Sequence, residues 1–462
     1  MSQQQSTTKR PDALLDAGVF SRPTNGVSEP DWLQSQRTTG WSSFEEIPMP
    51  TTSDEAWRRT NLKRIKWGKF QVAGTSSVEK TDSLSDLPDQ IQAAVDADRP
   101  AAGRLIIAND QIVFYDVDAN LAEQGVIFTD LASAVANHSD LVQKHLAGEA
   151  VPPSHDKFSA LNTALWQNGV FLYLPKEVEI EAPFQVAFVI EGEGTAIFPR
   201  TLIVAEELAS ATYIEENVSL SDHGQALNMG VTEVYAANSA QVRHVDVQRL
   251  GTDVYNFNVK RSIGDSDSMV IWETGQLGGR ITKNFYDSVL PGNGAMMEFN
   301  GIYFMEGKQH LDIDSLIHHI GVATGGDLLL HGAVKDKSRQ VFTGLIKIAD
   351  SGQQTNSYLK NENLLLDRTA RADSMPSLEI DANDVRASHG ATIGQIDEED
   401  IFYLMSRGVP RETAVRMVVE GFFYRVFDRM YNERVREKLF NAVSAKLGGR
   451  GLKDVVELEL DD

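Results

Sequence analysis

One histidine near the end of the chain is the first candidate for chemistry. His389 lies in a run of small residues, Ser388 to Thr392, and this run predicts a tight loop. Acidic residues at 397–400 follow it and suit the first turn of a helix. Taken alone, a histidine in such a loop is more often a hydrogen-bonding residue than a metal ligand. His389 therefore needs a second indication before it marks a site.

A second group of polar residues lies earlier in the chain. His310, Asp312 and Asp314 alternate, so on a strand their side chains would share one face. His318 and His319 follow closely. Two carboxylates and three imidazoles at this spacing are compatible with a hard-metal or hydrolase site. The alternative is structural, because long repeating β-structures often stack polar side chains along one face.

Four further carboxylates suggest a different chemistry. Glu215, Glu216, Asp246 and Glu273 could line a carbohydrate-cleaving groove, as in β-helical polysaccharide enzymes. Such enzymes are usually secreted, and residues 1–18 hold no apolar run long enough for an export signal. No later window has the apolar length of a membrane span. We therefore expect a cytoplasmic protein.

Composition excludes several functions. The chain has no cysteine, so it cannot build a disulfide, a zinc–thiolate site or a four-cysteine iron–sulfur site from its own residues. Its formal charge of −23 repels phosphate backbones and argues against nucleic-acid binding. The glycine-rich segments lack the spacing of a phosphate-binding loop, so ATP should bind elsewhere.

The elements that must position these residues fall into three regions. Residues 1–150 mix helical and strand patterns and predict an α+β N-terminal region. Residues 151–396 are a succession of short β-type runs, with turns that recur at Ser210, Ser239, Ser268 and Gly294. This repetition favours a β-helix over a β-sandwich. Residues 397–462 return to helical periodicity, and the apolar stripe from Ala414 to Met430 is broad enough for both core packing and docking of another protein.

Several segments together resemble the SufB/SufD family of iron–sulfur cluster assembly scaffolds. The stretch from Val385 to Gly408 is similar to the family's C-terminal signature. Its sequence HGATIGQID, which starts at His389, resembles the SufD branch in particular. Further similar segments are 156–162, 169–176, 309–319, 339–346, 361–366 and 376–380. The resemblance implies a right-handed parallel β-helix core followed by a helical C-terminal domain, which agrees with the regions read from the residues.

The resemblance also implies a role within a complex. Such proteins are scaffold subunits without a catalytic cycle, which pair with SufB through the β-helix and with the SufC ATPase through the C-terminal helices. It implies a transient iron–sulfur cluster or iron at the partner interface, with ATP bound through SufC. In the SufD branch the HGAT histidine, here His389, is the expected iron or cluster ligand. Many relatives have a cysteine two positions before it, where this chain has Ala387, so thiolate ligands would come from the partner.

Two alternatives stay open. The chain could be a SufB-like or homodimeric scaffold, although sulfur transfer to SufB relies on a thiol that this sequence lacks. It could also be a polysaccharide-active β-helical enzyme. A third interpretation keeps the scaffold role but makes His389 a structural loop residue only.

Overall fold

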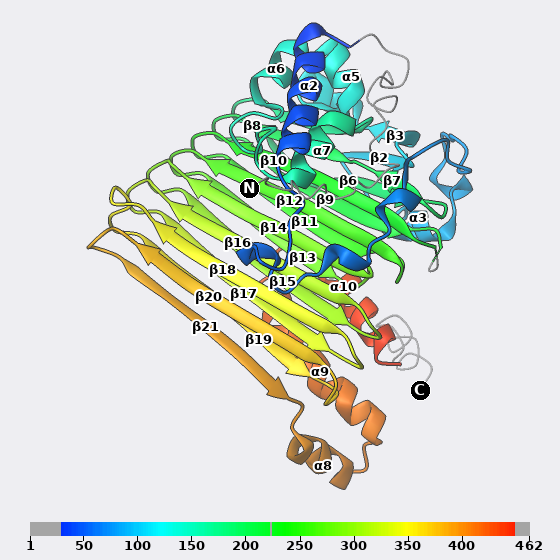
Figure 1. The fold of residues 1–462 in the computed structure, drawn as a ribbon, viewed down its shortest axis with the longest axis vertical. Coiled ribbons are helices and arrows are strands. Elements are labelled where there is room, and N and C mark those ends of the chain that lie inside the picture. Colours follow the sequence, from blue (N-terminus) through cyan, green and yellow to red (C-terminus); the bar gives the residue numbers. More distant parts are fainter. Residues whose placement is uncertain (1–28, 222–223, 449–462) are drawn as a thin grey trace, which may run out of the picture.

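The computed structural model describes residues 29–221 and 224–448 and shows a parallel β-solenoid with helical regions at both ends (Figure 1). This confirms the mainly β fold that the repeated turns predict. The solenoid strands are β5 (Gly169–Leu174), β6 (Glu179–Ile190), β7 (Thr195–Ile197), β8 (Arg200–Ala205), β9 (Ser210–Ser219), β10 (Ala226–Ala236), β11 (Gln241–Arg249), β12 (Val254–Gly264), β13 (Met269–Gln276), β14 (Ile281–Leu290), β15 (Met296–Met305), β16 (His310–His319), β17 (Gly325–Val334), β18 (Arg339–Ile348), β19 (Asn356–Leu365), β20 (Arg371–Ile380) and β21 (Arg386–Gln395).

Successive strands alternate between two sheets. The first sheet ends in the order β14, β16, β18, β20, and the second in the order β15, β17, β19, β21. We call them sheet A and sheet B. From β10 onward the neighbouring strands of the main stack pair in parallel. Each sheet therefore has one face toward the space between the sheets and one face outward.

A recurring turn sets the rung length. Non-glycine residues with positive φ occur once per rung at one corner, and a glycine replaces them on one rung. They are Leu208, Ser239, Asp267, Gly294, Ala323 and Gln354. The amide of each of these residues donates to a carbonyl of the next rung, as in Ser239 N to Ser266 O at 2.8 Å. The turns stack on one another, which explains the repeat that the sequence shows.

The core between the sheets changes character along the solenoid. Aromatic and polar side chains fill the early rungs, where Tyr213, His244 and Trp272 are fully buried. Aliphatic side chains fill the later ones, as Leu328 and Leu359 show. These five residues occupy one register column of sheet B.

The N-terminal region covers the start of the solenoid and the outer face of sheet A. Its strands join the solenoid sheets, because β2 pairs with β6 and β4 pairs with β5. Trp57 and Phe158 pack on Phe257 of sheet A. The elements are α2 (Asp31–Glu46), β1 (Gln71–Val72), α3 (Asp89–Ala94), β2 (Gly103–Ala108), β3 (Gln111–Val117), α4 (Ala119–Glu123), β4 (Ile127–Asp130), α5 (Leu131–Asn137), α6 (Ser139–His145) and α7 (Lys157–Leu165).

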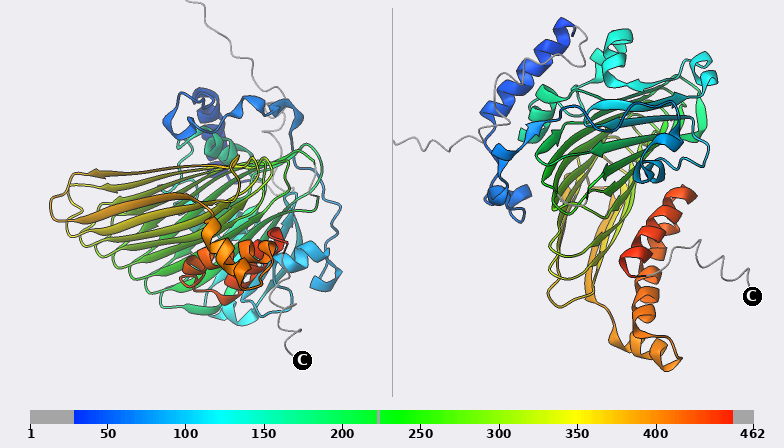
Figure 2. Two further views of the ribbon diagram at one scale, coloured as in Figure 1. Left: turned by 90° about the horizontal axis from the view of Figure 1, so that it is seen from below. Right: turned by 90° about the vertical axis from the view of Figure 1, so that its right-hand side faces the viewer.

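Two of the C-terminal helices lie against the other side of the solenoid (Figure 2). They are α9 (Arg411–Phe427) and α10 (Glu433–Lys446), and α8 (Glu398–Ser406) packs on α9. Val419 and Phe423 of α9 and Leu439 of α10 are buried against the outer face of sheet B. This confirms that part of the predicted apolar stripe is core.

Helix α10 also reaches the N-terminal region. Glu437 pairs with Arg99 at 2.7 Å, and Arg434 donates to the carbonyl of Pro100 at 2.8 Å. Lys438 donates to the carbonyl of Ala94 at 2.8 Å. The segment at 94–100 and the last described helix are therefore fastened together by three basic side chains.

None of the helices in the described part of the chain is long and apolar enough to cross a membrane.

Candidate functional site

His389 lies in the middle of β21, the last strand of sheet B, and not in the predicted loop. Small residues misled the prediction, since Ser, Gly and Ala also suit an edge strand with few packing neighbours. In register His389 follows Leu359, so it continues the inward column that contains Tyr213, His244 and Trp272. Unlike those residues it is exposed, because within the described residues no rung follows β21. The imidazole therefore faces the open end of the solenoid.

Ala387 shares that inward face. It lies two residues before His389 on the same strand, in register with Ser357, and packs at the edge of the core between the sheets. A cysteine at this position would place its thiol on the same strand face as the imidazole. The inward face of β21 therefore carries the imidazole of His389 and the methyl group of Ala387, and it has no thiol.

The cluster around His310 is organised by a lysine. His310, Asp312 and Asp314 share one face of β16 as predicted, and this is the outer face of sheet A, opposite the core. Lys283 of the neighbouring strand lies between the carboxylates, with Nζ 2.9 Å from Asp312 Oδ1 and 2.5 Å from Asp314 Oδ2. The hydroxyl of Thr60 donates to Asp312. An ammonium group therefore occupies the position that a metal ion would need.

Burial tunes this cluster. It raises the pKa of Asp314 to about 6 even though Lys283 lowers it. It lowers the pKa of His310 to about 4, with the charges of Arg339 and Lys283 acting in the same direction. His319 points inward, away from this cluster, where its ring nitrogens contact Thr324 and Ser357. No set of three or more metal-binding side chains occurs in the described ranges 29–221 and 224–448.

The carboxylates considered for carbohydrate cleavage lie on opposite sides of sheet B. Glu215 and Asp246 point into the core, where Lys260 Nζ is 2.8 Å from Glu215 Oε1 and 3.7 Å from Asp246 Oδ1. Burial alone would raise the pKa of Glu215, but Lys260 and His244 outweigh it and hold that pKa below its ordinary value. These two carboxylates have no access to a polymer.

The other two carboxylates lie beneath the C-terminal helices. Glu216 accepts from Lys438 of α10 and from Arg249. Glu273 accepts from the amide of Tyr431 at 2.9 Å, and burial raises the pKa of Glu273 to about 7. The four residues form no common groove, which removes the observation that motivated the polysaccharide-enzyme interpretation.

Lys260 and Lys283 are the residues that sequence reasoning missed. Both are fully or almost fully buried, and each holds two carboxylates. No local pattern marks them, because Lys260 lies between Val259 and Arg261 and Lys283 lies between Thr282 and Asn284. A buried lysine requires partners of opposite charge, and strand register is needed to find them on neighbouring strands.

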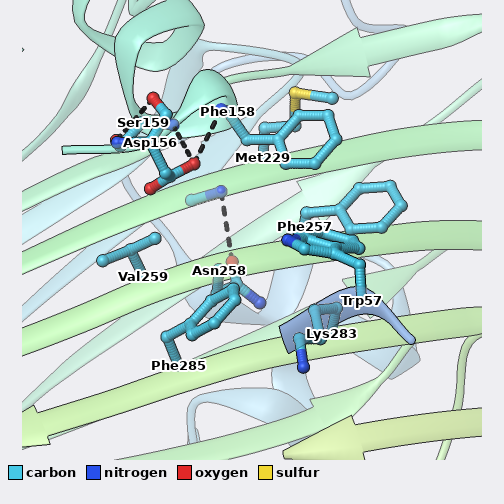
Figure 3. A pocket seen from close by; sticks show the side chains of 11 residues that line it. Trp57, Asp156, Phe158, Ser159, Met229, Phe257, Asn258, Val259, Lys283 and Phe285 are labelled. Atoms are coloured by element: carbon cyan, nitrogen blue, oxygen red, sulfur yellow. Dashed lines mark hydrogen bonds between the residues drawn. The ribbon is translucent and has the colours of Figure 1, made fainter. Parts of the chain in front are cut away.

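Two cavities bear on a possible ligand site. One lies between the N-terminal region and sheet A, lined by Trp57, Phe158, Phe257 and Phe285 (Figure 3). Its volume of about 10 Å³ has room for about one water molecule. A more open hollow of about 280 Å³ lies beside Tyr431. Two of the carboxylates that line it have partners, because Asp327 pairs with Arg429 and Glu298 accepts from Tyr431.

A large exposed surface remains on the C-terminal helices. Large apolar or aromatic side chains on α8 and α9 are exposed to solvent, and Phe402 is 72% exposed. The others are Tyr403, Met405, Met417 and Tyr424. We call these five residues the helical patch. Exposed aromatic residues at this density are typical of docking surfaces.

Comparison with known proteins gives a consistent result. Residues 188–422 match the model of the SUF system FeS cluster assembly SufBD core domain. Residues 26–186 match that of the SufBD protein N-terminal region. The chain is 32% identical to the iron–sulfur cluster assembly protein SufD of Bacillus subtilis over 91% of its own length and 95% of that relative. It is 28% identical to SufBD-family assembly proteins of Staphylococcus saprophyticus and Staphylococcus aureus, over 89% of each chain.

Proposed function

The chain belongs to the SufB/SufD family of iron–sulfur cluster assembly proteins, and on that premise we propose that it is a SufD-like scaffold subunit. It pairs with a SufB-type chain through the end of the solenoid and with a SufC-type ATPase through the C-terminal helices. The observation that carries this proposal is the position of His389, an exposed imidazole on the inward face of an uncovered last rung.

His389 supplies one ligand to iron or to a nascent cluster at the joint between the two scaffolds. A neutral imidazole is a suitable ligand for iron and replaces thiolate on some cluster irons. The chain has no cysteine, so the thiolate ligands and the sulfur acceptor belong to the partner. The site is therefore shared, and this chain holds the cluster only transiently and never alone.

The helical patch receives the ATPase. Its aromatic side chains are exposed although the opposite side of α9 is firmly packed on sheet B. This gives the partner a fixed platform. The ATP-binding residues lie on that partner, because the present sequence has no phosphate-binding loop. The interior carboxylates are engaged by lysines, which supports a scaffold role over catalysis.

The test is co-purification with SufB-type and SufC-type partners, followed by anaerobic iron and sulfide analysis. We expect a stable complex whose iron and sulfide content falls in the His389→Ala variant. His318→Ala is the matched control, because His318 lies on the outer face of sheet A. A stable complex with undiminished cluster in His389→Ala would leave His389 structural, and the absence of any complex would contradict the scaffold role.

A further inference from the structure

One corner of the solenoid carries a stack of basic side chains. It consists of the turns that lead from sheet B back to sheet A, between β15 and β16, β17 and β18, and β19 and β20. Lys308, Lys337 and Arg368 are each the third residue after a sheet B strand, and those strands end in register. All three side chains belong to exposed residues. We call them the basic ladder.

The carboxylates of the same three turns are engaged within the chain. Asp336 Oδ2 accepts from the amide of Gly307 at 2.8 Å, and Asp367 Oδ2 accepts from the amide of Asp336 at 2.7 Å. Glu306 is paired with Lys446 of α10. These bonds hold the turns in a stack, and they leave the acidic side chains with partners of their own.

The basic ladder lacks such partners. Within the ranges 29–221 and 224–448, none of its three cations forms an ion pair. Adjacent strands of a sheet lie about 4.8 Å apart, so the ladder brings like charges close together, which is unfavourable in a sheet. Carboxylates brought to the ladder would relieve this repulsion.

The positive charge is local to this corner. The opposite corner, where the chain passes from sheet A to sheet B, includes the turns 265–268, 349–355 and 381–385. These turns contain five aspartates and no lysine or arginine. Since the whole chain has a formal charge of −23, an acidic segment is repelled from most of the surface and attracted to the basic ladder.

The described chain ends beside the ladder. Helix α10 ends at Lys446, whose ammonium group contacts Glu306 in the first turn of the stack. Figure 1 shows the end of α10 next to the ends of the sheet B strands. Residues 449–462 lie outside the described residues. Their sequence has no basic residue after Lys453, and the last nine residues contain five carboxylates.

The length of this segment is sufficient to reach the ladder. An extended chain spans about 3.3 Å per residue, so Asp454 can lie up to about 20 Å from Gly448. Three rungs extend over only about 10 Å. A segment tethered in this way has an effective concentration on the order of millimolar. Surface ion pairs that are individually weak are then enough to hold it.

We propose that the acidic segment 454–462 binds to the basic ladder of its own chain. Its carboxylates pair with Lys308, Lys337 and Arg368 in the free protein. The occupant is this segment because tethering favours an intramolecular contact over a separate acidic chain of equal affinity. The segment thereby closes the basic corner to other acidic proteins until it is displaced. This inference does not depend on the proposed function.

Zero-length cross-linking of the full chain with a carbodiimide tests the contact. The reagent joins carboxylates to lysine amines that are already in contact. We expect linked peptides between residues 454–462 and Lys308 or Lys337. We expect none between these residues and Lys63, an exposed lysine of the N-terminal region. A mixture of light and heavy-isotope chains distinguishes links within one chain from links between two copies.

Two charge-reversal variants test the proposal independently. The ladder variant replaces the three cations of the ladder: Lys308→Glu, Lys337→Glu and Arg368→Glu. The control variant makes the same change in net charge at three exposed lysines of the N-terminal region: Lys63→Glu, Lys66→Glu and Lys69→Glu. Thermal unfolding shows whether both variants remain folded, and the cross-linking experiment needs no variant.

The measurement on the variants is the rate at which a glutamyl endopeptidase cuts after Glu457 and Glu459. Cleavage should be about fivefold faster in the ladder variant than in the wild type, because the segment is no longer held. In the control variant the rate should change less than about twofold. Salt at about 0.5 M should accelerate cleavage of the wild type and leave the ladder variant unchanged, because it screens surface ion pairs.

Each contrary outcome has a definite meaning. Equal cleavage rates in all three proteins, or a wild type without cross-links to the ladder, would overturn the proposal. Links between two copies alone would replace the segment of the same chain by that of a second copy and overturn the stated occupant. Protection that appears only after a SufB-type or SufC-type partner is added would also overturn it. Failure to bind either partner would refute the proposed function and leave this contact standing.

Discussion

The early rungs of the solenoid, β9 to β14, and its last rung, β20 and β21, treat their inward side chains in opposite ways. The early rungs enclose Glu215, Asp246 and Lys260 with almost no solvent access, whereas the last rung leaves Leu378 and Ile393 substantially exposed. Charges are inside and apolar groups are outside, the reverse of the usual arrangement.

The difference separates a region that stabilises the fold from a region whose side chains are available for contact with another molecule. The buried ions of the early rungs are satisfied within the chain and covered by other elements, so they contribute to a fixed structure. The apolar end has no cover within the described residues, and an exposed apolar surface of this kind is typical of a contact surface. His389 belongs to this second region although it continues a column that starts in the first.

Among the changes considered for the early rungs, removal of Lys260 should cause the largest loss of stability. Lys260→Met leaves two buried carboxylates without a counter-charge and should lower the free energy of unfolding by about 3–5 kcal/mol. Chemical denaturation measures this. Lys347→Met, which removes one partner of the surface pair with Glu379, is the control and should have little effect. Equal losses in the two variants would contradict the distinction.

Ile346 and Leu378 belong to the same inward column in successive rungs. Shortening each side chain in turn compares a buried rung with the exposed last rung. Ile346→Ala removes a fully buried side chain and should cost about 2–5 kcal/mol of unfolding free energy. Leu378→Ala, one rung later in register, should cost about 1 kcal/mol or less in the free chain. In the complex with a SufB-type partner the second variant should become the more damaging for binding. Equal stability losses in the free chain would show that the last rung is already covered.

Lowering the pH should destabilise the fold through the buried His319. Burial lowers the pKa of His319 to about 4, so the folded chain binds fewer protons than the unfolded chain between pH 6.5 and 4. Stability is therefore complete above the unfolded pKa of about 6.5 and falls as the pH drops. The loss attributable to His319 is on the order of 1–3 kcal/mol. Denaturation curves of the wild type and of His319→Gln across this range should converge at low pH, and parallel curves would contradict the assignment.

The smallest effect on stability is expected at the helical patch. Phe402→Ala removes a side chain that contacts mostly solvent and should change the unfolding free energy by less than about 0.5 kcal/mol. Binding of a SufC-type ATPase, measured by calorimetry, should nevertheless weaken about tenfold. Phe423→Ala is the control. Phe423 is buried between α9 and sheet B, so its loss should weaken the packing of α9 on that sheet. Unchanged ATPase binding in Phe402→Ala would remove this residue from the docking surface.

Sequence reasoning identified the solenoid because the turns near Ser239, Ser268 and Gly294 repeat. It also found the strand face shared by His310, Asp312 and Asp314. It could not tell that Lys283 fills that face, because strand register lies beyond local pattern. It placed His389 in a loop because small residues are common both in loops and in edge strands that have few packing neighbours.

The contact between α10 and residues 94–100 has a consequence for the order of synthesis. Each rung stacks on the one before it, so the solenoid can assemble as the chain leaves the ribosome. Glu216 and the neighbouring outer face of sheet B stay uncovered during that time, because Lys438 and Leu439 are made more than 200 residues later. The early rungs thus lack their outer cover for about half of translation. A nascent chain that stalls before α10 would present an apolar sheet face to chaperones, and completion of one helix ends that exposure.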